Sequence, residues 1–177
     1  MGFGIDETRV FKPISIAVLT VSDTRTADND TSGDLLVSRI KDAGHKLGDR
    51  ALLRDDIIDI QAQVIAWIAD PEIDAVISTG GTGLTGRDVT VEAFAPLFEK
   101  EIDGFSVVFH MVSFETVGLS TLQSRARAGL ANSTFMFCLP GSNGAVKDGW
   151  DKVIKAQLDS RHRPCNMVEL IPRLSET

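Results

Sequence analysis

Short, nearly continuous hydrophobic runs alternate along this chain with longer stretches of helical hydrophobic spacing. The runs predict four buried strands, at 15–21, 51–53, 75–78 and 134–139. The spaced stretches predict helices over 31–43, 57–68, 104–117 and 145–158, with shorter helices beginning at Val91 and covering 121–129. We therefore expect a three-layer α/β/α sandwich around a doubly wound, mostly parallel sheet.

Local signals mark several helix boundaries. Gly44 is expected at the C′ position that ends the first helix, because glycine adopts the left-handed conformation found there. Thr90 and Asp56 are expected to be N-caps, since their side-chain oxygens can accept from backbone N–H groups of the next turn. Pro96 is expected to bend or split the helix that starts at Val91.

The chain is expected to fold as one domain over 1–177, with 1–12 and 164–177 as terminal extensions. Its 177 residues are 43% hydrophobic and 24% charged, which is ordinary for a globular domain of this length. Two prolines follow Arg163, so segment 159–177 is predicted to be extended rather than helical. The sequence shows no internal repeat.

Charge and composition argue against several classes of partner. A net charge of −7 at pH 7 and an aromatic content of 6% without tyrosine disfavour nucleic acid, which needs a basic surface and stacking side chains. No run of 18 apolar residues and no apolar leader occurs, which predicts a soluble cytoplasmic protein without a membrane partner. Cys138 and Cys165 lack metal or redox spacing and are expected to be reduced thiols without a chemical role.

Segment 79–90 is the most unusual stretch of the sequence, with four glycines, four threonines and one aspartate in twelve residues. It joins a predicted strand to a predicted helix, and glycines at such a turn let the backbone approach a ligand closely. Backbone N–H groups and the hydroxyls of Thr79, Thr82 and Thr85 can donate to phosphate oxygens. We therefore predict a phosphate cradle with ligand contacts from Thr79, Gly80, Gly81, Thr82 and Gly83.

Two familiar phosphate motifs do not fit this stretch. Its glycines have G-x-G-x-x-G spacing, but the polar pair Arg87-Asp88 follows, and the next segment is helical rather than a strand ending in an acid. The same pair stands where a P-loop has lysine and then serine or threonine. A plain glycine turn without a ligand is the remaining alternative, and the many hydroxyls make it the weaker one.

Small or polar residues also follow the other predicted strands. They are Ser22, Asp23, Asp55, Pro140, Gly141 and Ser142. The carboxyl ends of parallel strands lie at one edge of a sheet, where ligands of such folds bind. These residues are therefore predicted to share one site with the glycine stretch. For Ser22 and Asp23, capping of a helix is an equal alternative.

Asp55 and Asp88 place carboxylates beside the predicted phosphate cradle. Two like charges roughly 4 Å apart repel by about 4 kcal/mol at an effective dielectric near 20. A divalent cation would relieve such repulsion, and magnesium is commonly held by one or two carboxylates together with substrate phosphates. We therefore predict Mg2+ at Asp55 and Asp88, and a phosphoryl- or nucleotidyl-transfer reaction.

The chain resembles the MoaB/MogA family of molybdopterin-binding proteins over nearly its whole length. The resemblance rests on TGGTG at 79–83, RDVT at 87–90, LQSRA at 122–126 and LPGS at 139–142. The MoaB branch is favoured by the segments at 65–68, 96–98, 120–126 and 163–166.

This resemblance implies a molybdopterin-binding α/β/α fold and a role in molybdenum cofactor biosynthesis. Active members of the family adenylylate molybdopterin with ATP and magnesium, and members assemble as trimers or as hexamers of two trimers. Asp55 and Asp88 match the family's functional aspartates, and Ser124 lies in a matching motif as a further expected ligand contact. An adenylyltransferase is therefore expected, with a pterin-binding or carrier protein without catalysis as the alternative. A generic nucleotide-binding regulator is disfavoured, because no P-loop lysine or ribose-binding acid is present.

The sequence departs from the family in one stretch. Ser106 and Val107 stand where glycine and glutamate are usual, and His110 stands where arginine is common. A carboxylate and a cation are thereby lost, and turnover is expected to be low if these groups align the nucleotide. The apolar stretch 104–117 is expected to be buried between subunits, because a single sandwich of this size has difficulty covering it.

Overall fold

A six-stranded sheet forms the centre of the molecule, in the order β3-β2-β4-β7-β6-β5. The protein is described here by a computed structural model that covers residues 3–176. Neighbouring strands are parallel from β3 to β7, while β6 pairs antiparallel with β7 and β5 antiparallel with β6. The strands are β2 (Ser15–Val21), β3 (Lys46–Leu53), β4 (Ala75–Thr79), β5 (Lys100–Glu101), β6 (Arg127–Ala131) and β7 (Thr134–Leu139).

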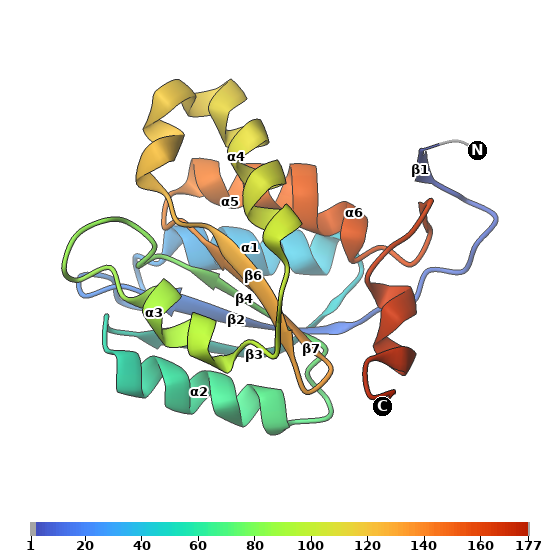
Figure 1. Ribbon diagram of the computed structural model, residues 1–177, viewed down its shortest axis with the longest axis horizontal. Helices are drawn as coiled ribbons and strands as arrows, with labels where there is room; N and C mark the ends of the chain where they lie inside the picture. Colours follow the sequence, from blue (N-terminus) through green and yellow to red (C-terminus); the bar gives the residue numbers. More distant parts are fainter. Residues whose placement is uncertain (1–2, 177) are drawn as a thin grey trace.

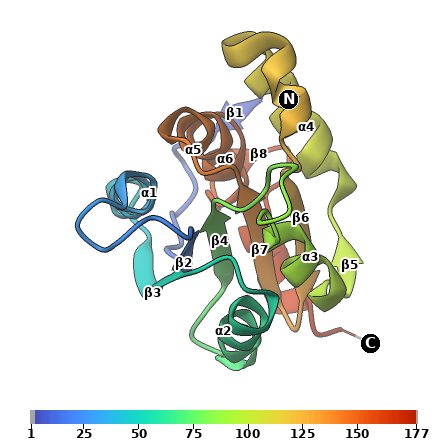
Figure 2. The same ribbon diagram turned by 90° about the vertical axis from the view of Figure 1, so that its left-hand side faces the viewer.

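Helices cover both faces of this sheet, so the predicted three-layer, doubly wound fold is confirmed (Figures 1 and 2). One face carries α1 (Thr31–Asp42), α4 (Asp103–Val117) and α5 (Asn143–Gly149), the last continuing through a π-helical turn (Trp150–Ile154) into α6 (Lys155–Gln157). The other face carries α2 (Ile57–Ala69) and α3 (Thr90–Phe94). Short 3₁₀ helices follow α3 (Ala95–Leu97) and α4 (Gly118–Gln123), and another lies near the C-terminus (Val168–Arg173).

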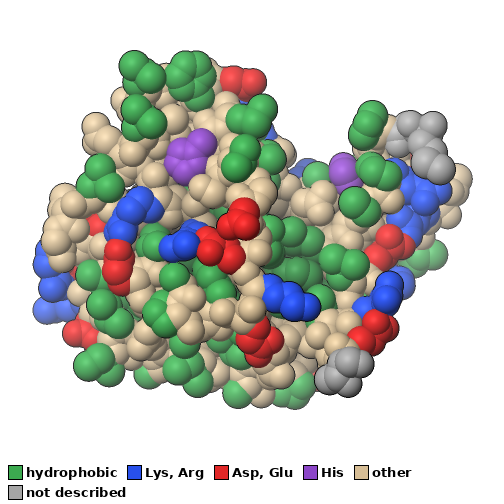
Figure 3. All heavy atoms as spheres, in the orientation of Figure 1, with side chains coloured by type: hydrophobic (Ala, Val, Ile, Leu, Met, Phe, Trp, Pro, Cys, Tyr) green, Lys and Arg blue, Asp and Glu red, His purple; other side chains and the backbone are tan. Residues whose placement is uncertain are grey.

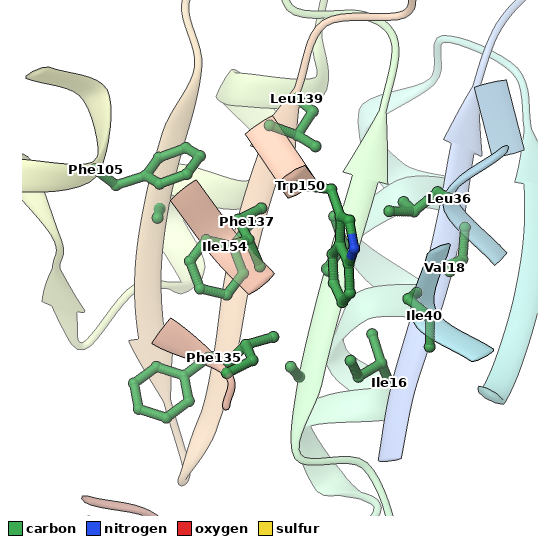
Figure 4. Packing of buried hydrophobic residues seen from close by; sticks show 14 of the residues in the cluster. Ile16, Val18, Leu36, Ile40, Phe105, Phe135, Phe137, Leu139, Trp150 and Ile154 are labelled. Carbon is green, nitrogen blue, oxygen red and sulfur yellow. The ribbon is translucent and has the colours of Figure 1, made fainter. Parts of the chain in front are cut away.

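Each face of the sheet has its own hydrophobic core. On the face of α1, α4 and α5, the fully buried Trp150 lies over β4 with Phe137 and Ile154 on one side and Leu36 and Ile40 on the other (Figure 4). The opposite core is formed by side chains of α2 and α3 against the same strands, including Ile60, Val64, Trp67 and Phe94. Burying one large apolar side chain contributes about 1.5–3 kcal/mol, so these clusters hold the helices on the sheet.

The prediction of a helix over 121–129 is wrong. Its first residues belong to the 3₁₀ helix Gly118–Gln123, and the chain then becomes β6. Ala128 and Gly129 pair with Phe137 and Met136 of β7. A Cβ on Gly129 would lie 2.2 Å from the ring of Phe98, so this strand uses small residues because aromatic rings pack directly on its backbone.

Other boundaries agree in part with the sequence. Gly44 follows α1 with a φ of +88°, and Asp56 caps α2 by accepting from the N–H groups of the first turn, both as predicted. Thr90 is the first residue of α3 rather than its cap, because its hydroxyl donates to the carbonyl of Gly80 at 2.8 Å. The strand predicted at 51–53 begins earlier, at Lys46.

The two ends of the chain pack against each other. Strand β1 (Gly4–Ile5) pairs antiparallel with β8 (His162–Arg163) in a separate two-stranded sheet at one side of the molecule (Figure 1). The tail is extended only in part, since it also contains the 3₁₀ helix Val168–Arg173. Val168 is buried in the larger core cluster, and this apolar contact ties the tail to the domain.

The stretch Asp103–Gln123 is the one helical segment of residues 3–176 long and apolar enough to cross a membrane by length and composition. Within the domain, Phe105 and Phe109 of α4 are buried in the core. Five hydrophobic side chains of the stretch are more than half exposed: Val107, Met111, Phe114, Leu119 and Leu122. Figure 3 shows hydrophobic side chains gathered over the part of the molecule where Figure 1 places α4. Three of the five lie on α4 and two on the 3₁₀ helix that follows it, and we call the five residues together the apolar α4 face.

Candidate functional site

A cavity of about 590 Å³ is lined by residues at the carboxyl ends of the parallel strands. The order of the strands reverses here, since the chain passes from β2 to β3 on one side and returns to β4 on the other. Crevices at such reversal points are the usual ligand sites of open α/β sheets. The loops after β2, β3, β4 and β7 all reach this cavity.

Apart from Thr85, the cavity brings together all but one of the residues predicted from the sequence to contact the ligand. Its lining includes Ser22, Asp23, Asp55, Gly80, Gly81, Thr82, Gly83, Asp88, Ser124, Pro140, Gly141 and Ser142. Thr79 is the exception, because it is fully buried beneath the wall and its hydroxyl donates to the carbonyl of Pro140 at 3.1 Å. Thr79 therefore ties β4 to the loop after β7.

The glycine loop after β4 needs glycine for two physical reasons. Gly80 and Gly81 have φ angles of +102° and +64°, which side chains with a Cβ rarely adopt. There is also no room for a side chain, since a Cβ on Gly81 would lie 2.2 Å from the hydroxyl oxygen of Thr90 and 2.8 Å from a carboxylate oxygen of Asp55. The loop therefore brings bare backbone against the cavity.

The threonines of this loop divide between two roles. Thr82 lines the cavity, as expected for a phosphate-binding residue. The hydroxyl of Thr85 instead donates to Asp88 at 2.5 Å, and the backbone N–H of Thr85 donates to the same carboxylate oxygen at 2.9 Å. The hydroxyl of Thr85 therefore holds Asp88 in this structure, and Thr85 itself does not line the cavity.

Arg125 fixes the shape of the glycine loop. Its Nε donates to the carbonyl of Gly83 at 2.7 Å, and its Nη2 donates to the carbonyl of Asp88 at 2.8 Å. The same guanidinium pairs with Glu92 of α3, whose pKa is lowered by that hydrogen bond. A planar guanidinium suits this task because its several donors point in fixed directions. Arg125 belongs to the LQSRA motif at 122–126, but the sequence alone does not predict that it holds the loop.

Three aspartates, Asp23, Asp55 and Asp88, line the cavity together with the glycine loop. The pKa of Asp55 is raised by burial and by the nearby charge of Asp23. The pKa of Asp23 is lowered by its hydrogen bonds from Arg87, whose Nε and Nη2 contact the two carboxylate oxygens at 2.7 and 2.8 Å. Burial raises the pKa of Asp88, but the hydrogen bonds from Thr85 outweigh it, and the net shift is downward.

Neither Ser22 nor Asp23 caps a helix. Asp30 is the N-cap of α1 and accepts from the N–H of Gly33 at 3.0 Å. Ser22 instead closes its own turn, since its hydroxyl oxygen accepts from the N–H of Arg25 at 3.3 Å. Both residues line the cavity, so the alternative of a capping role is wrong.

The loop after β7 closes another side of the cavity. Ser142 caps α5, because its hydroxyl oxygen accepts from the N–H of Ala145 at 3.1 Å. Gly144 and Ala145 in the first turn of α5 line the cavity, so the positive end of this helix faces it. Arg25 holds the loop in place by donating to the carbonyl of Gly141 at 2.8 Å.

A further wall of the cavity comes from residues that sequence reasoning missed. Ser113 and Val117 of α4, Ser120 and Thr121 of the following 3₁₀ helix, and Asp148 of α5 all line it. Asp148 lies four residues before Lys152, a spacing that on a helix usually marks a solvent-exposed ion pair. No local pattern distinguishes it from such a pair, because its place at the cavity depends on how α4 packs on α5.

The residues that depart from the family pattern lie outside this cavity, on α4. His110 has its Nδ1 2.6 Å from the carbonyl oxygen of Ser106 and its Nε2 3.1 Å from the carbonyl oxygen of Ser124. Val107 is 61% exposed and belongs to the apolar α4 face. His110 therefore supports the backbone beside the cavity rather than reaching into it.

The carboxylates fit a cation only in combination with a ligand. Within residues 3–176, no group of three or more histidine, cysteine, aspartate or glutamate side chains is placed to hold a metal ion by itself. Asp55 and Asp88 both line the cavity, and burial together with the nearby charge of Asp23 raises the pKa of Asp55. Two carboxylates completed by phosphate oxygens and water suit magnesium.

Comparison with known proteins gives a consistent result. Residues 17–160 match the family described as "Probable molybdopterin binding domain". The molybdenum cofactor biosynthesis protein B of Escherichia coli K12 is 50% identical over 156 residues, which cover 88% of this chain and 92% of that protein. Its counterpart in Bacillus subtilis is 44% identical over 142 residues, covering 80% of this chain and 84% of that protein.

Solved structures agree with the sequence matches. A crystal structure of a molybdenum cofactor biosynthesis protein B superposes with a TM-score of 0.82 at 40% identity, covering 85% of this chain and 94% of that one. The tungsten cofactor synthesizing protein MoaB from Pyrococcus furiosus superposes with a TM-score of 0.72 at 35% identity, covering 80% of this chain and 91% of that one.

Proposed function

This chain belongs to the molybdopterin-binding family of the molybdenum cofactor biosynthesis proteins B, and from that premise we propose that it binds molybdopterin and transfers an adenylyl group to it from ATP. The observation that carries the proposal is the convergence of the glycine loop, the start of α5 and the carboxylates of Asp55 and Asp88 on one cavity. Glycine loops and helix starts commonly bind phosphate, and carboxylates that hold magnesium recur in sites of phosphoryl transfer.

The phosphate of molybdopterin would bind where the backbone is most accessible. Gly81 and Gly83 of the loop and Gly144 and Ala145 of the first turn of α5 all line the cavity, so the phosphate would lie against backbone without bulky side chains. Arg125 and Asp88 hold the loop in this conformation before the ligand arrives. A loop held in advance loses little further freedom on binding, which favours affinity.

In the proposed reaction, a phosphate oxygen of molybdopterin attacks the α-phosphorus of ATP. The new P–O bond forms as the bond from the α-phosphorus to the bridging oxygen breaks, and pyrophosphate leaves, without oxidation or reduction. Asp55 and Asp88 would hold magnesium, which neutralises charge on the phosphates. The protein's own contribution is to keep the two phosphate groups in line and close together.

A carrier that binds molybdopterin without turnover is the second candidate. One observation favours it: a carboxylate oxygen of Asp88 is already engaged by the backbone and the hydroxyl of Thr85. A purely structural Asp88 would explain its place in the loop without catalysis. The enzyme is favoured because Asp55 places a second carboxylate at the cavity beside the same loop, which a carrier of an anionic ligand does not need.

We further propose that the protein is a homo-oligomer, a trimer or a hexamer of two trimers, with the apolar α4 face between subunits. Its five members are all more than half exposed in the single chain. Monomeric soluble proteins rarely expose apolar patches of this kind. A second copy of the chain is the proposed occupant, since closed symmetric assembly is the usual way in which a chain buries such a face.

The proposed site of action is the cytoplasm. Both cysteines are free, with Cys138 buried and Cys165 exposed. Burial raises the pKa of the Cys138 thiol to about 12, so it stays protonated at neutral pH. An exposed free thiol such as Cys165 is typical of proteins kept in a reducing compartment.

The experiment that tests the proposal incubates the purified protein with molybdopterin, MgCl2 and ATP, and follows adenylylated pterin and pyrophosphate by chromatography. Formation of both products in equal amounts supports the adenylyltransferase. Saturable binding of molybdopterin without either product supports the carrier. Absence of molybdopterin binding contradicts both candidates.

A further inference from the structure

Asp30 is a fully buried carboxylate that the proposed reaction does not use. It caps α1, and capping requires only the hydrogen bond that Oδ1 accepts from the N–H of Gly33. Gly33 stands in the first turn of the helix because a Cβ there would lie 2.1 Å from Oδ2 of Asp30. Glycine is a weak helix former, so the start of α1 is adapted to seat this carboxylate rather than to form the strongest helix.

Three further donors reach the same carboxylate from outside α1. Thr20 of β2 donates to Oδ2 at 2.6 Å, and Nη2 of Arg50 on β3 donates to Oδ2 at 2.8 Å. Nη1 of Arg25 donates to Oδ1 at 3.3 Å. Together with the N–H of Gly33, these donors fill the four acceptor positions of a carboxylate, and two guanidinium groups compensate its buried charge.

Arg25 connects this buried group to the cavity. The guanidinium that pairs with Asp30 also donates through Nη2 to the carbonyl of Gly141 at 2.8 Å. Gly141 lines the cavity and packs on the glycine loop, since a Cβ on it would lie 3.1 Å from the Cα of Gly80. The loop after β7 is therefore held by two contacts, one with the backbone of Gly80 and one with Arg25.

The position of the Arg25 guanidinium depends in turn on Asp30. A long arginine side chain loses much rotamer freedom when it is held in one place, so a single bond to a carbonyl fixes it poorly. Besides the carbonyl of Gly141, its Nη1 contacts Asp30 and the hydroxyl of Ser32. Of these two partners only Asp30 is charged, and hydrogen bonds between charged groups are roughly twice as strong as neutral ones. Asp30 therefore holds Arg25 at the loop before a ligand binds.

We propose that Asp30 is a positioning residue for the phosphate of molybdopterin: through Arg25 it sets the loop after β7 and the start of α5 against the glycine loop. This inference rests on the proposed binding of molybdopterin and adds a residue that does not touch the ligand. The alternative is an ion cluster of Asp30, Arg25 and Arg50 that only fastens α1 to the sheet. Arg50 distinguishes the two, because it pairs with Asp30 and Asp34, whereas Arg25 pairs with Asp30 and the loop.

The test compares wild type with Asp30→Asn, Arg25→Gln and Arg50→Gln. Asparagine is itself a good N-cap, so Asp30→Asn keeps the helix start and removes the charge that holds Arg25. Asp30→Asn and Arg25→Gln are each expected to raise the dissociation constant for molybdopterin by roughly 10- to 100-fold, the range seen when a supporting hydrogen bond behind a metal ligand is removed. Arg50→Gln should lower the melting temperature but bind molybdopterin as wild type does, because Thr20 and Gly33 still hold Asp30.

Two further measurements separate positioning from a general loss of stability. In the ligand-free protein, hydrogen exchange at the amides of 141–145, relative to those of α2, should be faster in Asp30→Asn and Arg25→Gln than in Arg50→Gln. In the transfer assay, Asp30→Asn should raise the KM for molybdopterin and leave kcat near the wild-type value, because it weakens binding of the phosphate without changing the reacting groups. If Asp30→Asn does not fold, Arg25→Gln carries the same test, since the side chain of Arg25 is 25% exposed.

Three outcomes would overturn the proposal. Molybdopterin binding by Asp30→Asn as tight as, or tighter than, that of wild type would show that the loop does not need this carboxylate. Equal loss of binding in Asp30→Asn and Arg50→Gln would mean that the cluster only fastens α1. Unchanged exchange at 141–145 in Asp30→Asn would contradict the positioning of the loop. If wild type does not bind molybdopterin, the proposed function fails, while the exchange measurement, which needs no ligand, still decides the role of Asp30.

Discussion

The guanidinium of Arg125 and the carbonyl oxygen of Gly83 are joined by a hydrogen bond of 2.7 Å from Nε. The backbone N–H of Arg125 donates in the same direction, to the carbonyl of Thr82 at 3.1 Å. The glycine loop is thus fastened from outside by a residue more than forty positions away in the chain. The carbonyl groups of Thr82 and Gly83 therefore point toward Arg125.

Arg125→Lys is expected to lower the free energy of unfolding by about 1–3 kcal/mol and to weaken molybdopterin binding, because lysine keeps the charge but cannot reach both loop carbonyls. Chemical denaturation and ligand titration measure the two effects. Arg127→Lys is the matched control, since Arg127 pairs with Glu101 at the partly exposed sheet edge. Its expected cost is within about 1 kcal/mol, with binding unchanged. Equal losses in both variants would show that the loop does not depend on Arg125.

Gly81→Ala is expected to abolish molybdopterin binding and to destabilise the fold. Its Cβ would lie 2.2 Å from the hydroxyl oxygen of Thr90, at a φ of +64°. Gly86→Ala in the same loop is the control, because a Cβ there meets nothing within 4 Å. Circular dichroism confirms folding before each titration. A folded Gly81→Ala variant that binds like Gly86→Ala would mean that the loop does not contact the ligand.

Asp55→Asn is expected to raise the melting temperature at neutral pH. The pKa of Asp55 in the folded protein is raised above its ordinary value of 3.8, so the folded state binds this proton more tightly than the unfolded state does. The resulting stabilisation is present below 3.8 and is lost as pH rises through the folded pKa. The asparagine variant lacks this loss, so its advantage over wild type should grow as pH rises through that window.

Calorimetric melting scans between pH 4 and pH 8 measure the difference between wild type and the Asp55→Asn variant. Asp28→Asn is the control, because Asp28 is exposed in the loop before α1. It should follow the wild-type curve at every pH. A lower melting temperature for Asp55→Asn across the whole range would mean that the carboxylate stabilises the fold, contrary to the shift in its pKa.

The sequence was sufficient to predict the layers of the fold but not one edge of the sheet. The strands β2, β4 and β7 are buried apolar runs, and such runs are recognisable without tertiary information. Strand β6 reads RAGLA, and alanine favours a helix by local propensity. Pairing with β7 and packing of Phe98 on Gly129 override that preference, and neither is visible in the local pattern.

The residues of the candidate site were also predictable only in part. Loops at strand ends were predictable because parallel strands bring their carboxyl ends together. Asp148 and Thr121 were not, since they lie in helical segments and reach the cavity only through the packing of α4 on α5. The misplaced Thr79 has the same origin: a residue at the last position of a strand faces either the ligand or the core, and only the structure decides.

The apolar α4 face leads to a prediction about assembly. Light scattering at micromolar concentration should give the mass of a trimer or a hexamer. Met111→Glu, which places a charge on a side chain that is 65% exposed, should shift the mass toward the monomer without unfolding the chain. Ala62→Glu, which places the same charge on an exposed position of α2 on the other face of the sheet, is the control and should leave the mass unchanged. A monomer mass for wild type would contradict the proposed assembly.

The most direct test of the proposed adenylyltransferase is the rate of pyrophosphate release from ATP in the presence of molybdopterin and saturating magnesium, compared between wild type, Asp88→Asn and Thr85→Val. Asparagine keeps the shape of Asp88 but removes its charge, so the rate should fall by roughly 10²- to 10³-fold with nearly unchanged molybdopterin affinity. Thr85→Val removes a hydroxyl that donates to Asp88 and leaves the carboxylate charged, so its rate should stay near that of wild type. Release by Asp88→Asn at the wild-type rate, or no release by wild type, would contradict the account.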